Sequence, residues 1–317
     1  MTFVHEDPEF IALLTRVSAK TGIAAALVEK DYWVTHSLWA LHETQLSIWF
    51  KGGTSLSKGF GIIERFSEDL DLMIERGAED SLPNVSNWAS TNKGPSAQRR
   101  AFYEALAGAL AVPGVSINLD AQRQDKYARS ADYVGRYAGV HVTGLPSAMS
   151  PFVRFEVGRA RVVPFAVMPL TSWVHDHLAH LGIGADYIDN RPQAVRCVHP
   201  IVTLLEKLDA LSRRYNRDVI EADAFVRHYE DAARIIRMRD RLPPLETSPL
   251  ALAEEMLVEK SIAALPIADD PSLVLDDPGK HASIARAYAQ IRPMFWGSRI
   301  PLDEACATIR GWVATLR

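Results

Sequence analysis

Two glycines followed by a pair of aspartates constrain the fold of this chain more than any other feature of its sequence. They lie in FKGGTSLSKGFGIIERFSEDLDLMIE, residues 50–75. The apolar run LSIWF predicts a strand that ends at Gly52-Gly53, and TSLSKGFGIIERF favours a tight turn and a short helix. In EDLDLMIE, the two-residue period of a strand puts Asp69 and Asp71 on one face, opposite the leucines. The stretch therefore predicts two strands joined by a turn and a helix, with two carboxylates on one face.

The glycine turn has the chemistry of a phosphate site, but it is not a P-loop. A P-loop has a glycine, four residues and then Gly-Lys-Ser/Thr, whereas here the four residues that follow Gly53 lead to Lys58-Gly59, in the reverse order. A Gly-Gly pair still lets the backbone approach a phosphate, and N–H groups and hydroxyls at the following helix start can bind its oxygens. The hydroxyl residues at this position are Thr54, Ser55 and Ser57.

Asp69 and Asp71 supply the second half of this chemistry. Carboxylate oxygens are the ligands that Mg²⁺ prefers, and Mg²⁺ bridges to nucleotide phosphates. A nucleoside triphosphate with its metal would explain the turn and the aspartates together. Taken separately, a plain turn and a strand with a hydrated polar face explain them as well, so both interpretations stay open at this point.

The whole string GGTSLSKGF…RFSEDLDL resembles the AbiEii/AbiGii family of nucleotidyltransferase-like toxins, in the DNA polymerase β-type nucleotidyltransferase superfamily. In that superfamily a Gly-Ser-like turn binds the nucleotide phosphates, and Asp-x-Asp on the next strand coordinates two metals that promote attack on the α-phosphate. The residues implied for nucleotide binding are Gly52, Gly53, Thr54 and Ser55, and those implied for catalysis and metal binding are Asp69 and Asp71. Thr54 replaces the serine of the wider superfamily and keeps its hydroxyl.

Two later segments extend the resemblance. LLEKLDALSRRYNRD and FVRHYEDAARI are similar to the family's lysine and aspartate motifs, which places Lys207 and Asp231 among the catalytic residues. Lys207 would stabilise negative charge on the triphosphate, and Asp231 would fix that lysine or a substrate hydroxyl. The residues alone also allow a surface lysine beside Glu206 and Asp209, and a salt-bridged helix surface around Asp231.

Three further residues join the predicted site. Superfamily members usually carry a third carboxylate on a nearby strand, and FVRFEVGRA offers Glu156 as a metal ligand, with Arg154 on the same strand face. A plain Arg-Glu strand face is the alternative. Ser67 falls on the face of Asp69 and is expected to touch metal-bound phosphate. Arg65 is expected to pair with phosphate or with a neighbouring glutamate.

The rest of the chain predicts an α/β (α+β) fold, with a mixed β-sheet flanked by helices and a C-terminal helical domain. The segments VSINLDAQ, GVHVTGL, PFVRFEVGRA and PFAVMPL are strand-like, whereas every long segment after Pro200 has helical spacing. We therefore expect a nucleotidyltransferase domain over residues 1–198 and a helical domain over residues 199–317 that contributes Lys207 and Asp231 to the active site.

Composition limits the partners. The net charge is −4, so contact with nucleic acid requires a local basic patch. Residues 93–136 hold seven basic residues against four acids, and residues 207–241 hold nine against seven. Two distant cysteines indicate neither disulfides nor a structural zinc site, and the N-terminus lacks signal-peptide character. No apolar run approaches a membrane span, and a cytoplasmic location is expected.

These observations predict a Mg²⁺-dependent enzyme, with Mn²⁺ as an alternative, that transfers a nucleoside monophosphate from an NTP and releases pyrophosphate. The resemblance implies a toxin that acts on the 3′ end of tRNA, causes growth arrest in toxin–antitoxin or abortive-infection defence, and has a winged-helix antitoxin as partner. One alternative is transfer to a protein or small-molecule hydroxyl. Another is a nucleotide-binding protein without catalysis; the presence of Asp69, Asp71 and Lys207 argues against it.

Overall fold

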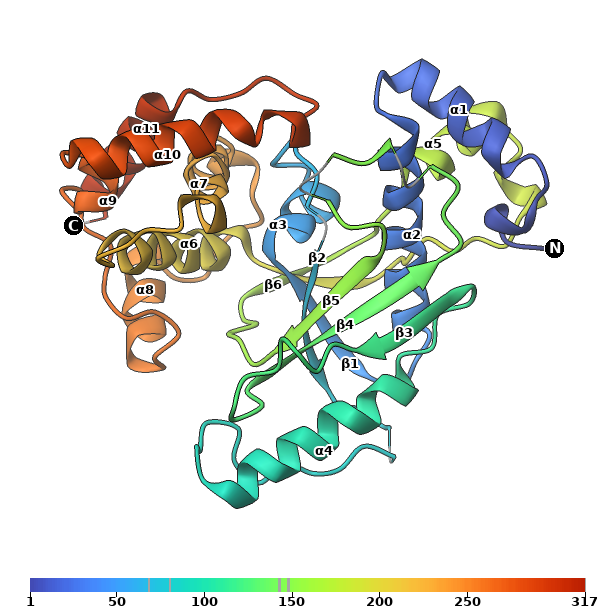
Figure 1. Ribbon diagram of the computed structural model, residues 1–317, viewed down its shortest axis with the longest axis horizontal. Helices are drawn as coiled ribbons and strands as arrows, with labels where there is room; N and C mark the ends of the chain where they lie inside the picture. The colour runs from blue at the N-terminus through green and yellow to red at the C-terminus, as the bar shows by residue number, and fades with distance from the viewer. Residues whose placement is uncertain (68, 80, 142–143, 147–148, 317) are drawn as a thin grey trace. The chain divides into compact units, whose positions relative to one another are not determined.

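The computed structural model describes residues 1–67, 69–79, 81–141, 144–146 and 149–316 (Figure 1). The chain forms two compact units. Unit 1 comprises Met1–Gly59, Glu68–Arg159 and Val167–Cys197, and unit 2 comprises Phe60–Ser67, Ala160–Ala166 and Val198–Arg317. Unit 2 therefore includes two short segments that lie between parts of unit 1 in the sequence.

Unit 1 is built around a mixed sheet, as the sequence predicts. Among the described residues the strands pair in the order β3-β4-β5-β2-β1-β7-β6. Their bounds are β1 Ser47–Lys51, β2 Asp69–Glu75, β3 Val115–Leu119, β4 Ser130–Tyr137, β5 Val153–Gly158, β6 Phe165–Met168 and β7 Val195–Val198. Strand β2 runs antiparallel to β1 and parallel to β5, while β4 runs antiparallel to both β3 and β5. This mixture of directions confirms the predicted fold class.

Helices cover the sheet of unit 1. The longer ones are α1 Phe10–Thr21, α2 Ala25–His42, α4 Lys93–Ala109 and α5 Trp173–Leu181, and the short ones are η1 Val4–Glu6, α3 Gly52–Thr54, η2 Ser55–Gly59 and η4 Gly184–Asp186. Helices α1, α2 and α5 pack on one another, α2 also contacts β5, and α4 contacts β3 (Figure 1). Gly22, whose backbone is left-handed, ends α1 and separates it from α2.

Unit 2 is mainly helical, as the periodicity after Pro200 predicts. Its elements are α6 Pro200–Tyr215, η5 Ala222–Ala224, α7 Arg227–Arg237, η6 Arg239–Arg241, α8 Pro249–Val258, α9 Pro271–Val274, α10 Pro278–Gln290, η7 Arg292–Met294 and α11 Leu302–Ala314. Helix α7 packs against both α6 and α11. Prolines in the first turns of α6, α8, α9 and α10 follow residues whose side chains accept a hydrogen bond from the helix start, which fixes where each helix begins.

The structure corrects two predictions of secondary structure. In GVHVTGL, the described residues 139–141 and 144–145 form no strand, because the N–H groups of Val140 and His141 donate to the carboxylate of Glu29, each at 2.8 Å. The helix expected up to residue 66 stops at Gly59. Residues 60–67 form no helix; Arg65 forms an isolated bridge with Phe295, and the Phe66 N–H donates to the Met294 carbonyl at 2.7 Å.

Within the described part of the chain, no single helix is long and apolar enough to cross a membrane, although α1 and α2 together, bent by 112°, meet the same length and composition criteria.

Candidate active site

The glycine turn follows β1 and presses directly against a predicted metal ligand. Gly52 has a left-handed backbone with φ of 74°. A Cβ atom built on it would lie 1.7 Å from Oδ2 of Asp71. Glycine is therefore required at this position for both its backbone conformation and its close approach to a carboxylate.

Two hydroxyls of the turn donate hydrogen bonds to backbone carbonyls of the protein. Thr54 is buried and donates to the Asp69 carbonyl at 2.7 Å, so it ties the turn to β2. Ser55 is also buried, and Ser57 donates to the Thr54 carbonyl at 3.1 Å. The structure therefore brings Gly52, Thr54 and the two aspartates together. The Thr54 hydroxyl, however, donates to a backbone carbonyl.

A buried run of charged residues on α2 supports this turn, and sequence reasoning missed it. Asp31 accepts from Lys58, the lysine of the turn, and from the N–H of Trp173 at 3.0 Å. Lys30 donates to the Ser150 carbonyl at 2.6 Å, and Glu29 binds the two N–H groups described above. The signal in the sequence is the run Glu-Lys-Asp inside an otherwise apolar helix, because buried charges in such a place need partners.

The predicted metal ligands lie in one row across the sheet. Asp71 on β2 pairs in register with Glu156 on β5, and Glu156 pairs with Asp132 on β4. Asp69 pairs in the same way with Arg154. Paired residues point to the same face of a sheet, so these four acidic side chains share one face. Asp132 was not identified from the sequence, because β4 was not recognised as a strand.

Burial and the crowding of like charges raise pKa values in this row of carboxylates. Burial raises the pKa of Glu156 to about 8, and the carboxylates of Asp71, Asp69 and Asp132 add to the effect, while Arg123 opposes it. Burial likewise raises the pKa of Asp132, against the attraction of Arg123 and Arg154. Partly ionised carboxylates that repel one another form an environment that a cation would stabilise.

Two arginines, Arg123 and Arg154, compensate part of the negative charge of these carboxylates. The Arg154 guanidinium lies 3.2 Å from Asp120, 3.5 Å from Asp132 and 3.8 Å from Asp69. Arg123 lies 3.0 Å from Asp132 and 3.8 Å from Glu156. Acids outnumber these arginines in the cluster, which comprises Asp69, Asp71, Asp120, Asp132, Glu156, Arg123 and Arg154.

The donor set fits a hard divalent cation. Asp69, Asp71 and Glu156 offer only carboxylate oxygens from two adjacent strands, which is the ligand chemistry of Mg²⁺ or Mn²⁺. Among the residues that the structure describes, however, no three His, Cys, Asp or Glu side chains are already arranged to hold a metal ion. The residues therefore match the metal in chemistry without forming a closed coordination shell.

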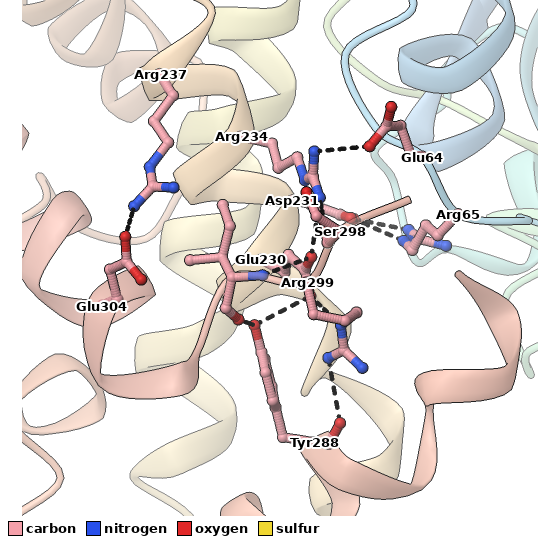
Figure 2. A network of polar contacts seen from close by, with 11 residues as sticks. Glu64, Arg65, Glu230, Asp231, Arg234, Arg237, Tyr288, Ser298, Arg299 and Glu304 are labelled. Atoms are coloured by element: carbon pink, nitrogen blue, oxygen red, sulfur yellow. Dashed lines mark hydrogen bonds and ion pairs between the residues drawn. The ribbon is translucent and has the colours of Figure 1, made fainter. Parts of the chain in front are cut away.

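The other predicted residues lie in unit 2 and form a buried ionic group (Figure 2 shows Arg65 and Asp231). Arg65 donates to Asp231 through Nε at 2.8 Å and Nη2 at 2.7 Å. Lys207 Nζ donates to the same carboxylate at 2.8 Å. All three side chains are buried, so neither Lys207 nor Asp231 belongs to an exposed salt-bridged surface.

Two cations surround one carboxylate in this group, so the charge of Asp231 is fully compensated and one positive charge remains. Burial disfavours the Asp231 carboxylate, but Arg65 and Lys207 outweigh that effect and hold its pKa well below the ordinary value. Asp231 therefore fixes Lys207, one of its two predicted roles. Arg65 contacts Asp231, and Ser67 lies before β2, outside the strand.

Glu230, the residue before Asp231, holds the C-terminal part of unit 2 (Figure 2). It is buried and accepts from Arg299 at 2.5 Å, from Tyr288 at 3.1 Å and from the Ile300 N–H at 3.1 Å. The segment around Phe295 also forms a β-bridge with Arg65. The helical tail, for which the sequence suggested no role, therefore braces the segment that carries Arg65.

The chain is similar to a known family of proteins. A family model described as "Nucleotidyl transferase AbiEii toxin, Type IV TA system" matches residues 38–307. A search of curated proteins finds no match. The matched range contains every residue of the predicted site.

Proposed function

Because the chain belongs to the AbiEii nucleotidyl transferase toxin family of type IV toxin–antitoxin systems, we propose that it transfers a nucleoside monophosphate from an NTP to the 3′ end of tRNA. The observation that carries this proposal is the row of Asp71, Glu156 and Asp132 beside a glycine turn that touches Asp71. Loss of functional tRNA would cause growth arrest. A cognate antitoxin, of winged-helix regulator type, would counteract it in the cytoplasm, where NTPs and tRNA occur together.

In this reaction the acceptor hydroxyl oxygen forms a bond to the α-phosphorus, and the bond from that phosphorus to the β-phosphate bridging oxygen breaks. The hydroxyl proton is lost to solvent, and pyrophosphate leaves. Asp69, Asp71 and Glu156 would hold Mg²⁺, which would neutralise charge on the phosphates and favour ionisation of the hydroxyl. Mn²⁺ offers the same chemistry to the same oxygens.

The protein residues have separate tasks in this proposal. Gly52 and Gly53 bring backbone close to the phosphates, and Thr54 keeps the turn attached to β2 through the Asp69 carbonyl. Lys207 provides a fixed positive charge, which Asp231 stabilises.

The test is transfer of label to purified RNA. We would incubate the protein with total tRNA, Mg²⁺ and each α-labelled NTP in turn, beside Asp71→Ala and the exposed-site control Asp223→Ala. Label in tRNA with the wild type and the control, but not with Asp71→Ala, would support the proposal and identify the nucleotide. Label in protein or in small molecules would refute the tRNA acceptor, and bound NTP without any transfer would refute catalysis.

A further inference from the structure

A basic loop lies beside the carboxylate row in unit 1. Residues 121–129, AQRQDKYAR, connect β3 to β4 and contain three basic residues and one acid: Arg123, Lys126, Arg129 and Asp125. Arg100 on α4 joins them, since its guanidinium donates to the Lys126 carbonyl at 3.1 Å and to Gln124 Oε1 at 3.3 Å. We call residues 121–129 together with Arg100 the cationic loop. All four of its cations are exposed to solvent.

A buried arginine fixes the backbone of the cationic loop. Arg99 is fully buried and donates to the Tyr127 carbonyl at 2.7 Å and to the Ala128 carbonyl at 3.2 Å. Its remaining donors bind the carbonyls of Asn87 at 2.9 Å and Ser90 at 2.8 Å. Because the carbonyls of the loop point inward to Arg99, their negative ends are neutralised and the loop has a defined conformation before any ligand binds.

Contacts within the cationic loop hold its charged side chains in place. Ala128 has a left-handed backbone with φ of 49°, and its N–H donates to the Asp125 carbonyl at 2.9 Å. Lys126 and Arg129 both lie over the Tyr127 ring, 4.9 Å and 5.7 Å from its centroid. Asp125 offsets one charge by pairing with Arg129 at 2.6 Å. The loop therefore presents a net excess of positive charge at fixed positions.

The cationic loop is continuous with the candidate active site. Arg123 lies 3.0 Å from Asp132 and 3.8 Å from Glu156, so one end of the loop contacts the carboxylate row. Arg129 comes three residues before Asp132 along the chain, and Arg100 contacts the backbone of Lys126 in the same loop. An acceptor whose reacting hydroxyl reaches the carboxylates would thus have the rest of its chain near these cations.

We propose that the cationic loop binds the phosphodiester backbone of the acceptor RNA through Arg100, Lys126 and Arg129. This rests on the proposed function, because a polynucleotide acceptor carries phosphates next to its reacting end. A polyanion is the partner that the charges favour: the chain as a whole carries −4, so the attraction must be local, and phosphate oxygens are ligands for exposed lysine and arginine.

The test measures RNA binding without NTP, so that it does not depend on transfer. Full-length protein is titrated into fluorescently labelled tRNA at 50–200 mM KCl, and Arg100→Gln/Lys126→Gln is compared with wild type and with Arg16→Gln/Lys20→Gln, two exposed cations on α1. Each phosphate contact contributes about 0.7–0.9 to the slope of log affinity against log salt concentration. We expect the loop variant to lose about tenfold in affinity and about 1.5 in slope, and the α1 variant to match wild type.

Two results would overturn the proposal: an unchanged slope in the loop variant, or an equal loss in the α1 variant. Lys126→Glu alone provides a second test if Arg100→Gln/Lys126→Gln unfolds at lower temperature, and it should lower the slope by about one. The transfer assay separates the two proposals. If label reaches tRNA but substitutions in the cationic loop do not change RNA binding, only the proposed role of the loop is refuted. RNA binding that needs the loop, without label in any acceptor, would refute only the transferase.

Discussion

The carboxylates of unit 1 and the carboxylate of Asp231 in unit 2 show opposite uses of the same chemical group. In unit 1, Asp71, Glu156 and Asp132 lie side by side with incomplete compensation, and burial and mutual repulsion raise the pKa of Glu156 to about 8. In unit 2, Asp231 is buried between two cations that hold its pKa well below the ordinary value. Uncompensated charge is available to a ligand, whereas compensated charge stabilises the protein.

Substitution at Asp71 should give the largest effect on function with little effect on folding. Asp71→Asn keeps the shape of the side chain but removes a charge from the predicted metal ligands, so we expect kcat/KM for transfer to fall at least about a thousandfold. The free energy of unfolding should change by less than about 1 kcal/mol, because the carboxylate repels its neighbours. Label transfer and urea unfolding measure the two quantities.

Glu75→Gln is the matched control for Asp71→Asn. Glu75 lies on the same strand four residues later and pairs with Arg159 at 2.8 Å at a half-exposed position. Its substitution should leave transfer unchanged. Equal losses in both variants would mean that the strand tolerates no change of charge, and the assignment of Asp71 to the reaction would fail.

Substitution at Asp231 should show the reverse pattern, a large loss of stability. Asp231→Ala leaves Arg65 and Lys207 buried without their shared partner, which should lower the free energy of unfolding by about 3–5 kcal/mol. Urea unfolding monitored by circular dichroism measures this loss. Lys207→Met in the Asp231→Ala background should recover part of it, because one uncompensated charge is removed.

If Asp231→Ala lowers the free energy of unfolding by less than about 1 kcal/mol, the contrast drawn between the carboxylates of the two units is wrong. Asp223→Ala, at an exposed position close in the sequence, is the control and should leave the free energy of unfolding unchanged. A loss of transfer without loss of stability in Asp231→Ala would instead show that the carboxylate acts on the substrate.

The sequence predicted elements whose signals are local. The alternation around Asp69 and Asp71 and the helical spacing after Pro200 are confirmed as β2 and as the helices of unit 2. Both signals depend on the periodicity of neighbouring residues, which survives any tertiary arrangement.

What could not be predicted depends on partners that are distant in the sequence. Residues 139–141 were predicted to form part of a strand, but the N–H groups of Val140 and His141 donate hydrogen bonds to the carboxylate of Glu29 instead. Arg65 was expected to pair with phosphate or with a neighbouring glutamate, and the sequence did not indicate its contact with Asp231, which lies 166 positions away. Asp132 was missed because Val134 on its own face and Gly135 on the opposite face interrupt the alternation of β4. Contacts of this kind require the fold before they can be seen.

Gly52→Ala should have an intermediate effect and tests whether the turn positions Asp71. Alanine must adopt a left-handed backbone there, and its Cβ would lie 1.7 Å from Asp71 Oδ2, so the carboxylate or the turn must move. A displacement of about 1 Å commonly reduces catalysis about a hundredfold. Measurement of kcat/KM for transfer gives this loss directly.

Gly22→Ala separates displacement from backbone strain. Gly22 has φ of 72°, close to that of Gly52, but nothing lies within 4 Å of the added Cβ. This variant should therefore lose about 1–2 kcal/mol of stability without losing transfer. Transfer that is equally reduced in both variants would show that strain alone explains the result at Gly52.

The smallest predicted effect is a dependence of metal affinity on pH, which arises from Glu156. Because its pKa is raised to about 8 in the absence of metal, the side chain is mostly protonated at pH 7, and a cation must displace that proton to bind. Affinity for Mn²⁺, measured by electron paramagnetic resonance, should rise about fivefold from pH 7 to pH 8 and level off above that range. Glu156→Gln should bind more weakly at pH 8 and lose this dependence. An unchanged pH dependence in Glu156→Gln would assign the titration to another member of the row, and Asp132→Asn, on the neighbouring strand, would then be the variant that removes it.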